Sequence, residues 1–126
     1  MIASSLTRPV ELPTQPAAAR RQLRRLLGDA GWDGDSDAVV LAVHEAMVNA
    51  QRHGGGIRRA TAALDGRTVV VEVTDGGDGF NVPKSPTMPD PSGETGRGLY
   101  LIRRLADDVD VVRSGEEVCL VLRFER

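Results

Sequence analysis

The sequence predicts an α/β fold, more strictly an α+β two-layer sandwich: a mixed, mostly antiparallel sheet with helices on one face. Three observations predict this class. Apolar residues recur with helical spacing in the first half of the chain, and they alternate with polar residues in two later pairs of segments. The length of 126 residues fits one domain, so all these elements are expected to share one core.

A short strand and a helix are expected at the N-terminal end. Residues 10–12 form the strand. The helix spans about 17–30, because leucines recur there every three or four positions. Thr14 is placed to cap this helix, Pro16 is tolerated in its first turn, and Gly31 ends it.

A second helix is expected from Asp35 or Ser36, either of which can cap it, to about His53. Three consecutive glycines follow and stop it. Beyond them the period changes from helix to strand. The elements expected there are strands at 60–64 and 69–73 around an Asp-Gly turn, a long loop at 76–96, a helix at about 97–106, and a hairpin of 109–112 with 118–124.

Composition narrows the functional classes. The net charge of −2 gives no electrostatic case for direct nucleic-acid binding. No apolar run approaches the roughly 20 residues that span a bilayer, and the N-terminus lacks the pattern of a secretory signal. Cys119 is the only cysteine and is expected to be buried in an apolar strand, as in a reducing cytoplasm. We therefore expect a cytoplasmic protein with no membrane segment.

Three polar residues recur at every fourth position of the second helix: Glu45, Asn49 and His53. This spacing places them on one helical face. A carboxylate beside a carboxamide offers oxygen ligands to Mg²⁺ and can orient a hydroxyl or a water. A solvated polar stripe is the alternative. A zinc-protease site is excluded, because Val48 stands where the second histidine would be needed.

A glycine-rich loop, Asp75-Gly76-Gly77-Asp78-Gly79-Phe80, follows the predicted strand at 69–73. Its glycines let the backbone approach a flat ligand closely, and a carboxylate at the end of a strand can accept a hydrogen bond from an exocyclic amine. An ordinary turn and a partial calcium loop are the alternatives. The calcium interpretation lacks the spaced ligands and the terminal glutamate.

A second glycine-rich segment, Gly93-Glu94-Thr95-Gly96-Arg97-Gly98-Leu99, lies where a loop is expected to enter the third helix. Free backbone N–H groups at a helix N-terminus form a phosphate site. The alternative is simply the beginning of an amphipathic helix. The segment is not a P-loop, because no Gly-Lys-Ser/Thr follows, and it does not follow a strand as a Rossmann motif would.

Taken in order, the three motifs resemble the N, G1 and G2 boxes of the GHKL (Bergerat-fold) ATPases. The resemblance covers nearly the whole chain and is strongest to the anti-sigma-factor serine kinases of the RsbW and SpoIIAB type. The segment at 43–54 matches the N box of that group in full. One departure concerns the G1 box, where the usual Asp-Asn-Gly-x-Gly has Gly76 in place of the asparagine.

The resemblance implies a cofactor, Mg·ATP, and a role for each motif. Asn49 would hold Mg²⁺, Glu45 would be the general base, and Asp75 would contact the adenine amine. Residues 81–95 would form the ATP lid. The remaining nucleotide-binding residues would be His53, Gly77, Gly79 and Phe80 around the base, and Thr95, Gly96, Arg97, Gly98 and Leu99 at the phosphates.

The resemblance also implies protein partners: a sigma factor and a STAS-domain antagonist that is phosphorylated on Ser or Thr. Arg20 and Arg21, on the first helix, would face these partners, and a homodimer is expected. The leading interpretation is a serine/threonine kinase that sequesters a sigma factor. Two alternatives stay open: a non-catalytic module that binds partners under the control of ATP, and a switch kinase that activates a phosphatase.

Overall fold

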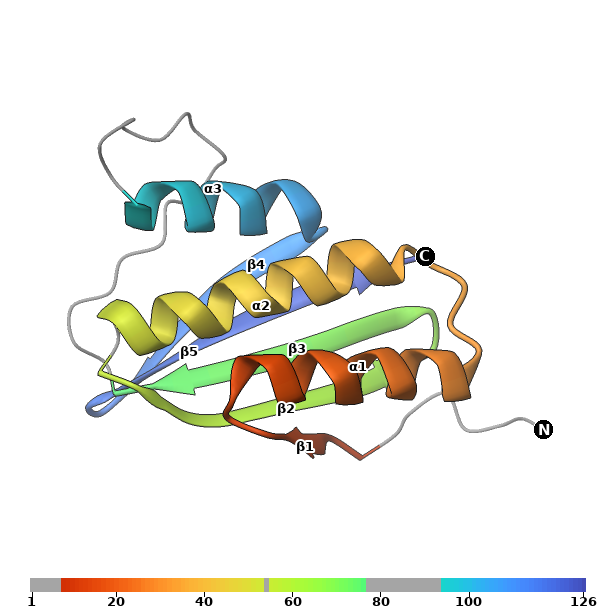
Figure 1. The fold of residues 1–126 in the computed structure, drawn as a ribbon, viewed down its shortest axis with the longest axis horizontal. Helices are drawn as coiled ribbons and strands as arrows, with labels where there is room; N and C mark the ends of the chain where they lie inside the picture. Colours follow the sequence, from red (N-terminus) through yellow and green to blue (C-terminus); the bar gives the residue numbers. More distant parts are fainter. Residues whose placement is uncertain (1–7, 54, 77–93) are drawn as a thin grey trace.

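The computed structural model describes residues 8–53, 55–76 and 94–126. Figure 1 shows three helices side by side on one face of a five-stranded sheet, with α2 between α1 and α3. This arrangement confirms the predicted α+β class. The elements in chain order are β1 (Val10–Leu12), α1 (Pro16–Ala30), α2 (Ser36–His53), β2 (Ile57–Asp65), β3 (Thr68–Asp75), α3 (Glu94–Leu105), β4 (Asp108–Ser114) and β5 (Glu117–Glu125).

The sheet has the strand order β1-β2-β3-β5-β4, and all four of these neighbouring pairs are antiparallel. The expected parallel component of a mixed sheet is therefore not found among the described strands. Two of these pairs, β2–β3 and β4–β5, are tight hairpins, which are antiparallel because each joins neighbouring strands through a two-residue turn. Gly66 and Gly115 occupy these turns with φ of 64° and 61°, a backbone conformation that glycine adopts without steric cost.

Helix α1 is capped by Gln15 and not, as predicted, by Thr14. The Gln15 Oε1 atom accepts a hydrogen bond of 2.7 Å from the backbone N–H of Ala18. Pro16 explains the shift, because proline favours the first helical position and holds the preceding residue in an extended conformation. At the other end Gly31 adopts φ 67° and closes the helix, as predicted.

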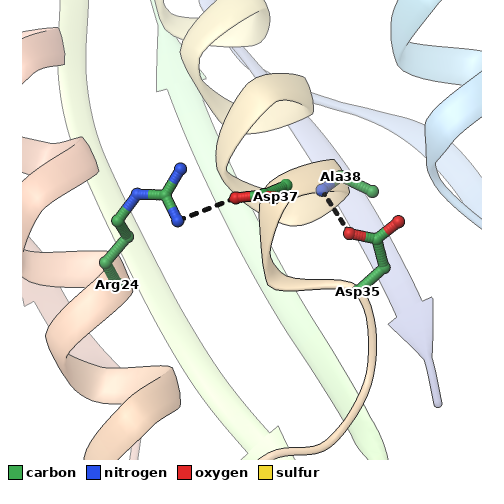
Figure 2. Close-up of polar contacts among 4 residues, drawn as sticks. All are labelled: Arg24, Asp35, Asp37 and Ala38. Atoms are coloured by element: carbon green, nitrogen blue, oxygen red, sulfur yellow. Dashed lines mark hydrogen bonds and ion pairs between the residues drawn. The ribbon is translucent and has the colours of Figure 1, made fainter.

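Helix α2 begins after Asp35, one of the two predicted caps. The Asp35 Oδ1 atom accepts a hydrogen bond of 3.1 Å from the N–H of Ala38 (Figure 2). The helix ends at His53, and Gly55 and Gly56 follow with positive φ. These glycines permit the sharp exit that carries the chain directly into β2.

The core lies between the helical layer and the inner face of the sheet. Every second residue of β3 and β5 points into it, as the alternating pattern requires. The apolar residues predicted to face the core from the first two helices are buried or packed against it. They are Leu23, Leu26 and Leu27 of α1 and Val39, Val40, Val43, Met47 and Ala50 of α2.

Cys119 does not lie in this core, which corrects the expectation of a buried thiol. Its side chain is half-buried on the outer face of the sheet, where the Sγ atom donates a hydrogen bond of 3.7 Å to Glu72 Oε1. Strand alternation is the reason, since the neighbours Val118 and Leu120 take the inward positions. Burial, as the largest cause, raises the pKa of the Cys119 thiol, and the nearby Glu72 carboxylate raises it further.

Candidate nucleotide site

The sequence motifs fall on three elements at one side of the molecule: the second half of α2, the end of β3 and the beginning of α3. Helix α2 packs against both β3 and α3. The polar residues of the first motif lie on α2, and Asp75 is the last residue of β3. The third motif falls in the first turns of α3.

Asn49 and Glu45 lie on neighbouring turns of α2 but differ in exposure. Asn49 is 5% exposed, whereas Glu45 is half-buried. Residues four apart on a helix differ by about 40° around its axis, so Asn49 turns towards the protein interior and Glu45 towards its rim. The helical face predicted to be shared by Glu45 and Asn49 therefore lies at the border between core and solvent. The amide of Asn49 is on the core side, and the carboxylate of Glu45 is on the solvent side.

The side-chain amide of Asn49 has an unused hydrogen-bond donor inside the part of the protein that the structure describes. Its Nδ2 atom is buried without a hydrogen-bond partner among the described residues. Such buried polar atoms are rare in folded proteins and usually mark a place where a water, ion or ligand group completes the bonding. The Nδ2 group can donate to a phosphate oxygen, and the amide oxygen is a type of ligand that Mg²⁺ accepts, so the chemistry of the residue is compatible with both.

Asp75 is also buried, at 4% exposed. It closes β3 and lies opposite Ile57 of β2 and Val118 of β5, so two neighbouring strands fix the position of its backbone. A buried carboxylate that is held in this way is a strong acceptor for hydrogen bonds, because little water competes for it. This chemistry matches the predicted contact with an exocyclic amine.

Helix α3 begins three residues before the expected Arg97. Its first residue is Glu94, so Glu94 and Thr95 belong to the helix and not to a loop that ends at 95. The first N–H groups of a helix have no partner within it, so the backbone of Glu94 to Arg97 offers N–H groups of the kind that bind phosphates in other proteins.

Leu99 is 3% exposed and belongs to the hydrophobic core. Its side chain anchors α3 to the rest of the fold, and only its backbone could contact a phosphate. Several other predicted positions lie outside the described residues. They are Gly77, Gly79, Phe80 and residues 81–93 of the predicted lid, together with the side chains of His53, Thr95 and Arg97.

Within 8–53, 55–76 and 94–126, no group of three His, Cys, Asp or Glu side chains could hold a metal ion. Mg²⁺ commonly takes most of its ligands from phosphates and water, so a magnesium site with Asn49 would not require such a group. No helix in this part of the chain is long and apolar enough to cross a membrane.

The fold and these three segments define a nucleotide-binding α+β domain of the GHKL class. The chain belongs to the family of histidine kinase-like ATPase domains, whose sequence model matches residues 10–124. It is therefore a member of an ATP-binding family, and the resemblance that the N, G1 and G2 motifs indicate is confirmed.

Solved structures include a similar protein, the RsbU and RsbW domains of Rv1364c from Mycobacterium tuberculosis. The two chains share 25% sequence identity with a TM-score of 0.67, over 94% of this chain. This chain corresponds to only 32% of the length of that one. A search of curated proteins finds no significant match.

Proposed function

We propose that this chain is an anti-sigma factor and protein serine/threonine kinase that binds Mg·ATP and phosphorylates a STAS-domain antagonist. The observation that carries the proposal is the pairing on α2 of a buried amide, Asn49, with a half-buried carboxylate, Glu45. One is suited to hold a metal inside the site, and the other can reach a hydroxyl that arrives from solvent. The similarity to an RsbW domain supports the same class of activity.

Each residue would perform one part of the reaction. Asn49 would ligate Mg²⁺, Asp75 would accept a hydrogen bond from the adenine amine, and the N-terminal N–H groups of α3 would bind phosphate oxygens. Bound Mg²⁺ would neutralise charge on the phosphates. Glu45 would accept the proton of the Ser or Thr hydroxyl. The hydroxyl oxygen would form a bond to the γ-phosphorus of ATP, while the bond between that phosphorus and the β,γ-bridging oxygen breaks and ADP is released.

The partner proposals rest on the surface of α1. Arg20 and Arg21 are exposed there and offer positive charge to a sigma factor or an antagonist. A homodimer remains part of the proposal, as for other members of this kinase group.

The test is transfer of phosphate to candidate STAS-domain proteins of the same genome. Each is incubated with the chain and Mg·ATP, and intact mass then reports a gain of one phosphate. We expect Glu45→Gln to slow this transfer by roughly 10²- to 10⁴-fold, the usual contribution of a general base. The variant should keep its affinity for Mg·ATP, since Glu45 is not assigned to nucleotide binding.

The control is Glu116→Gln, which removes a carboxylate from the exposed turn between β4 and β5 and should transfer phosphate at the wild-type rate. Unchanged transfer by Glu45→Gln would refute the role of Glu45. Tight nucleotide binding with no transfer to any antagonist would favour the non-catalytic module. Transfer without binding to any sigma factor would favour the switch kinase.

A further inference from the structure

An ion pair joins two strands that are not neighbours in the sheet. The Arg58 Nη1 atom of β2 lies 3.3 Å from the Glu117 Oε2 atom of β5 and donates a hydrogen bond to it. Strand β3 lies between these two strands, so their backbones are about 10 Å apart. The two side chains must therefore reach across β3 to meet, and we call this contact the β2–β5 ion pair.

The β2–β5 ion pair lies at the end of β3 that carries Asp75. Val118 is the ladder partner of Asp75, so Glu117 is level with Gly76, the next residue of the chain. Asp75 is the last residue of β3 and its last ladder position on both sides. The ion pair is therefore found where the ladders of β3 end, beside the carboxylate that is assigned to the adenine amine.

An irregularity in β2 explains how Arg58 comes to point across the sheet. Ile57 lies opposite Asp75 on β3. The next ladder pair of β2 is Arg59 with Thr74, so Arg58 is an extra residue without a ladder partner of its own. Such a bulge bends its strand and re-aims a side chain, and bulges are common beside functional sites. The bulge thus places an arginine at the beginning of β2, beside the end of β3.

The outer face of the sheet is covered at this place. Thr74 points to that face, since it lies opposite Cys119 and lines the same pocket there. It is nevertheless only 4% exposed, so side chains of the neighbouring strands close over it. Two residues further along the chain, Gly76 has no side chain that could come between Arg58 and Glu117. The end of β3 is therefore enclosed on its outer face, where the β2–β5 ion pair crosses.

We propose that the β2–β5 ion pair positions Asp75: it holds the end of β3 so that the carboxylate meets the exocyclic amine of the base. This inference rests on the proposed nucleotide site. A hydrogen bond depends steeply on distance and angle, so a shift of part of an ångström at its acceptor weakens it. Arg58 and Glu117 act through Asp75 and do not themselves contact the nucleotide.

The exposure of the ion pair sets the size of the expected effect. The side chains of Arg58 and Glu117 are 53% and 39% exposed. Exposed ion pairs are weak, so we expect the loss of this one to change recognition of the base by about two- to fivefold in affinity. The change should depend on the amine of the ligand, because only the contact with Asp75 is displaced.

The experiment compares ATP with purine riboside triphosphate, which lacks the exocyclic amine, in the presence of Mg²⁺. Isothermal titration calorimetry measures both dissociation constants for the full chain as wild type, Arg58→Glu, Glu117→Arg and the double variant that exchanges the two charges. Wild type should prefer ATP. We expect each single variant to reduce this preference about two- to fivefold by weakening the binding of ATP, and the double variant to restore most of it.

Arg59→Glu is the matched control. Arg59 is adjacent to Arg58 on the same strand and is exposed, but it is not the partner of Glu117. The variant makes the same change of charge at nearly the same place, so it should keep the preference of wild type for ATP. Circular dichroism and the fluorescence of Trp32 verify that every variant is folded.

The positioning role is overturned if both single variants keep the preference of wild type, or if Arg59→Glu loses as much of it. Loss of affinity for both nucleotides by the same factor also overturns it, because such a loss does not involve the amine. A double variant that recovers nothing would contradict the ion pair as the cause. Failure of the proposed function gives a different result. A wild-type chain that binds both nucleotides equally would reject the contact between Asp75 and the amine, and the positioning role with it.

Discussion

At the scale of single residues, Glu45 and Asn49 have equivalent positions in the helical pattern of the sequence but differ in burial. The spacing of Glu45 and Asn49 predicts a common helical face, but only the structure shows that one is half-buried and the other enclosed. Their order in sequence contains no information on where the sheet and α3 lie around α2. Asp75 is similar, because its burial depends on β2 and β5, which pair with β3 on either side.

Cys119 is a second residue whose burial the sequence does not predict, and here the structure shows less burial than expected. The apolar neighbours of this residue predict burial, yet alternation places its side chain outward beside Glu72 and Thr74. Burial raises the pKa of the thiol most, the Thr74 hydrogen bond lowers it, and Glu72 raises it. The thiol is therefore protonated at a pH where a free cysteine has begun to ionise.

We predict that iodoacetamide alkylates Cys119 more slowly at pH 8 than it alkylates an unstructured cysteine, because the thiolate is the nucleophile. Glu72→Gln removes a negative charge, so it should lower the pKa and speed alkylation. Mass spectrometry of the modified chain across a pH series gives the pKa directly. An unchanged profile for Glu72→Gln, with Glu116→Gln as the exposed control, would rule out this electrostatic effect.

At the scale of elements, the ends of the helices show how far the local sequence determines where a helix begins and ends. Gly31 at the end of α1 and Asp35 at the beginning of α2 act as predicted. Gln15 replaces Thr14 as a cap because the fixed φ of Pro16 sets the first helical position. Helix α3 begins at Glu94 although the glycines at 96 and 98 have low helix propensity, since its apolar face packs against α2.

The cap of α2 leads to a prediction on stability. Asp35→Ala removes the acceptor for the Ala38 N–H and should lower the free energy of unfolding by about 1 kcal/mol. Asp37→Ala is the matched control, because its exposed ion pair with Arg24 is worth less than the cap. Trp32, the only tryptophan, reports unfolding by fluorescence, since its Nε1 atom donates a hydrogen bond of 2.9 Å to the Arg67 carbonyl.

If the two alanine variants unfold at the same denaturant concentration, side-chain capping is not what fixes the beginning of α2. Packing of its apolar face on the core would then be the dominant cause.

At the scale of the whole molecule, the sequence predicts the class of fold and both hairpins, but not the order of strands. Each hairpin is local, because a turn of two residues joins its strands. The pairing of β3 with β5 joins residues about 50 positions apart, from Thr68 with Glu125 to Asp75 with Val118. No local pattern specifies such a contact. It forms because the apolar inner faces of both hairpins are buried together under α2 and α3.

This strand order is what assembles the candidate site. With β5 beside β3, the end of β3 is flanked by strands on both sides and covered by helices, so Asp75 and Asn49 are both enclosed. The sequence predicts which residues belong to the site, and the packing of the whole chain explains why Asn49 and Asp75 are buried.

We propose that Asn49 joins metal and nucleotide in this fold. Isothermal titration calorimetry of ATP, with and without Mg²⁺, into wild type and Asn49→Ala tests it most directly. We predict that wild type binds ATP more tightly with Mg²⁺ than without it, and that Asn49→Ala loses at least tenfold of the affinity measured with Mg²⁺. Equal affinity of the two proteins for ATP in the presence of Mg²⁺ would contradict the account.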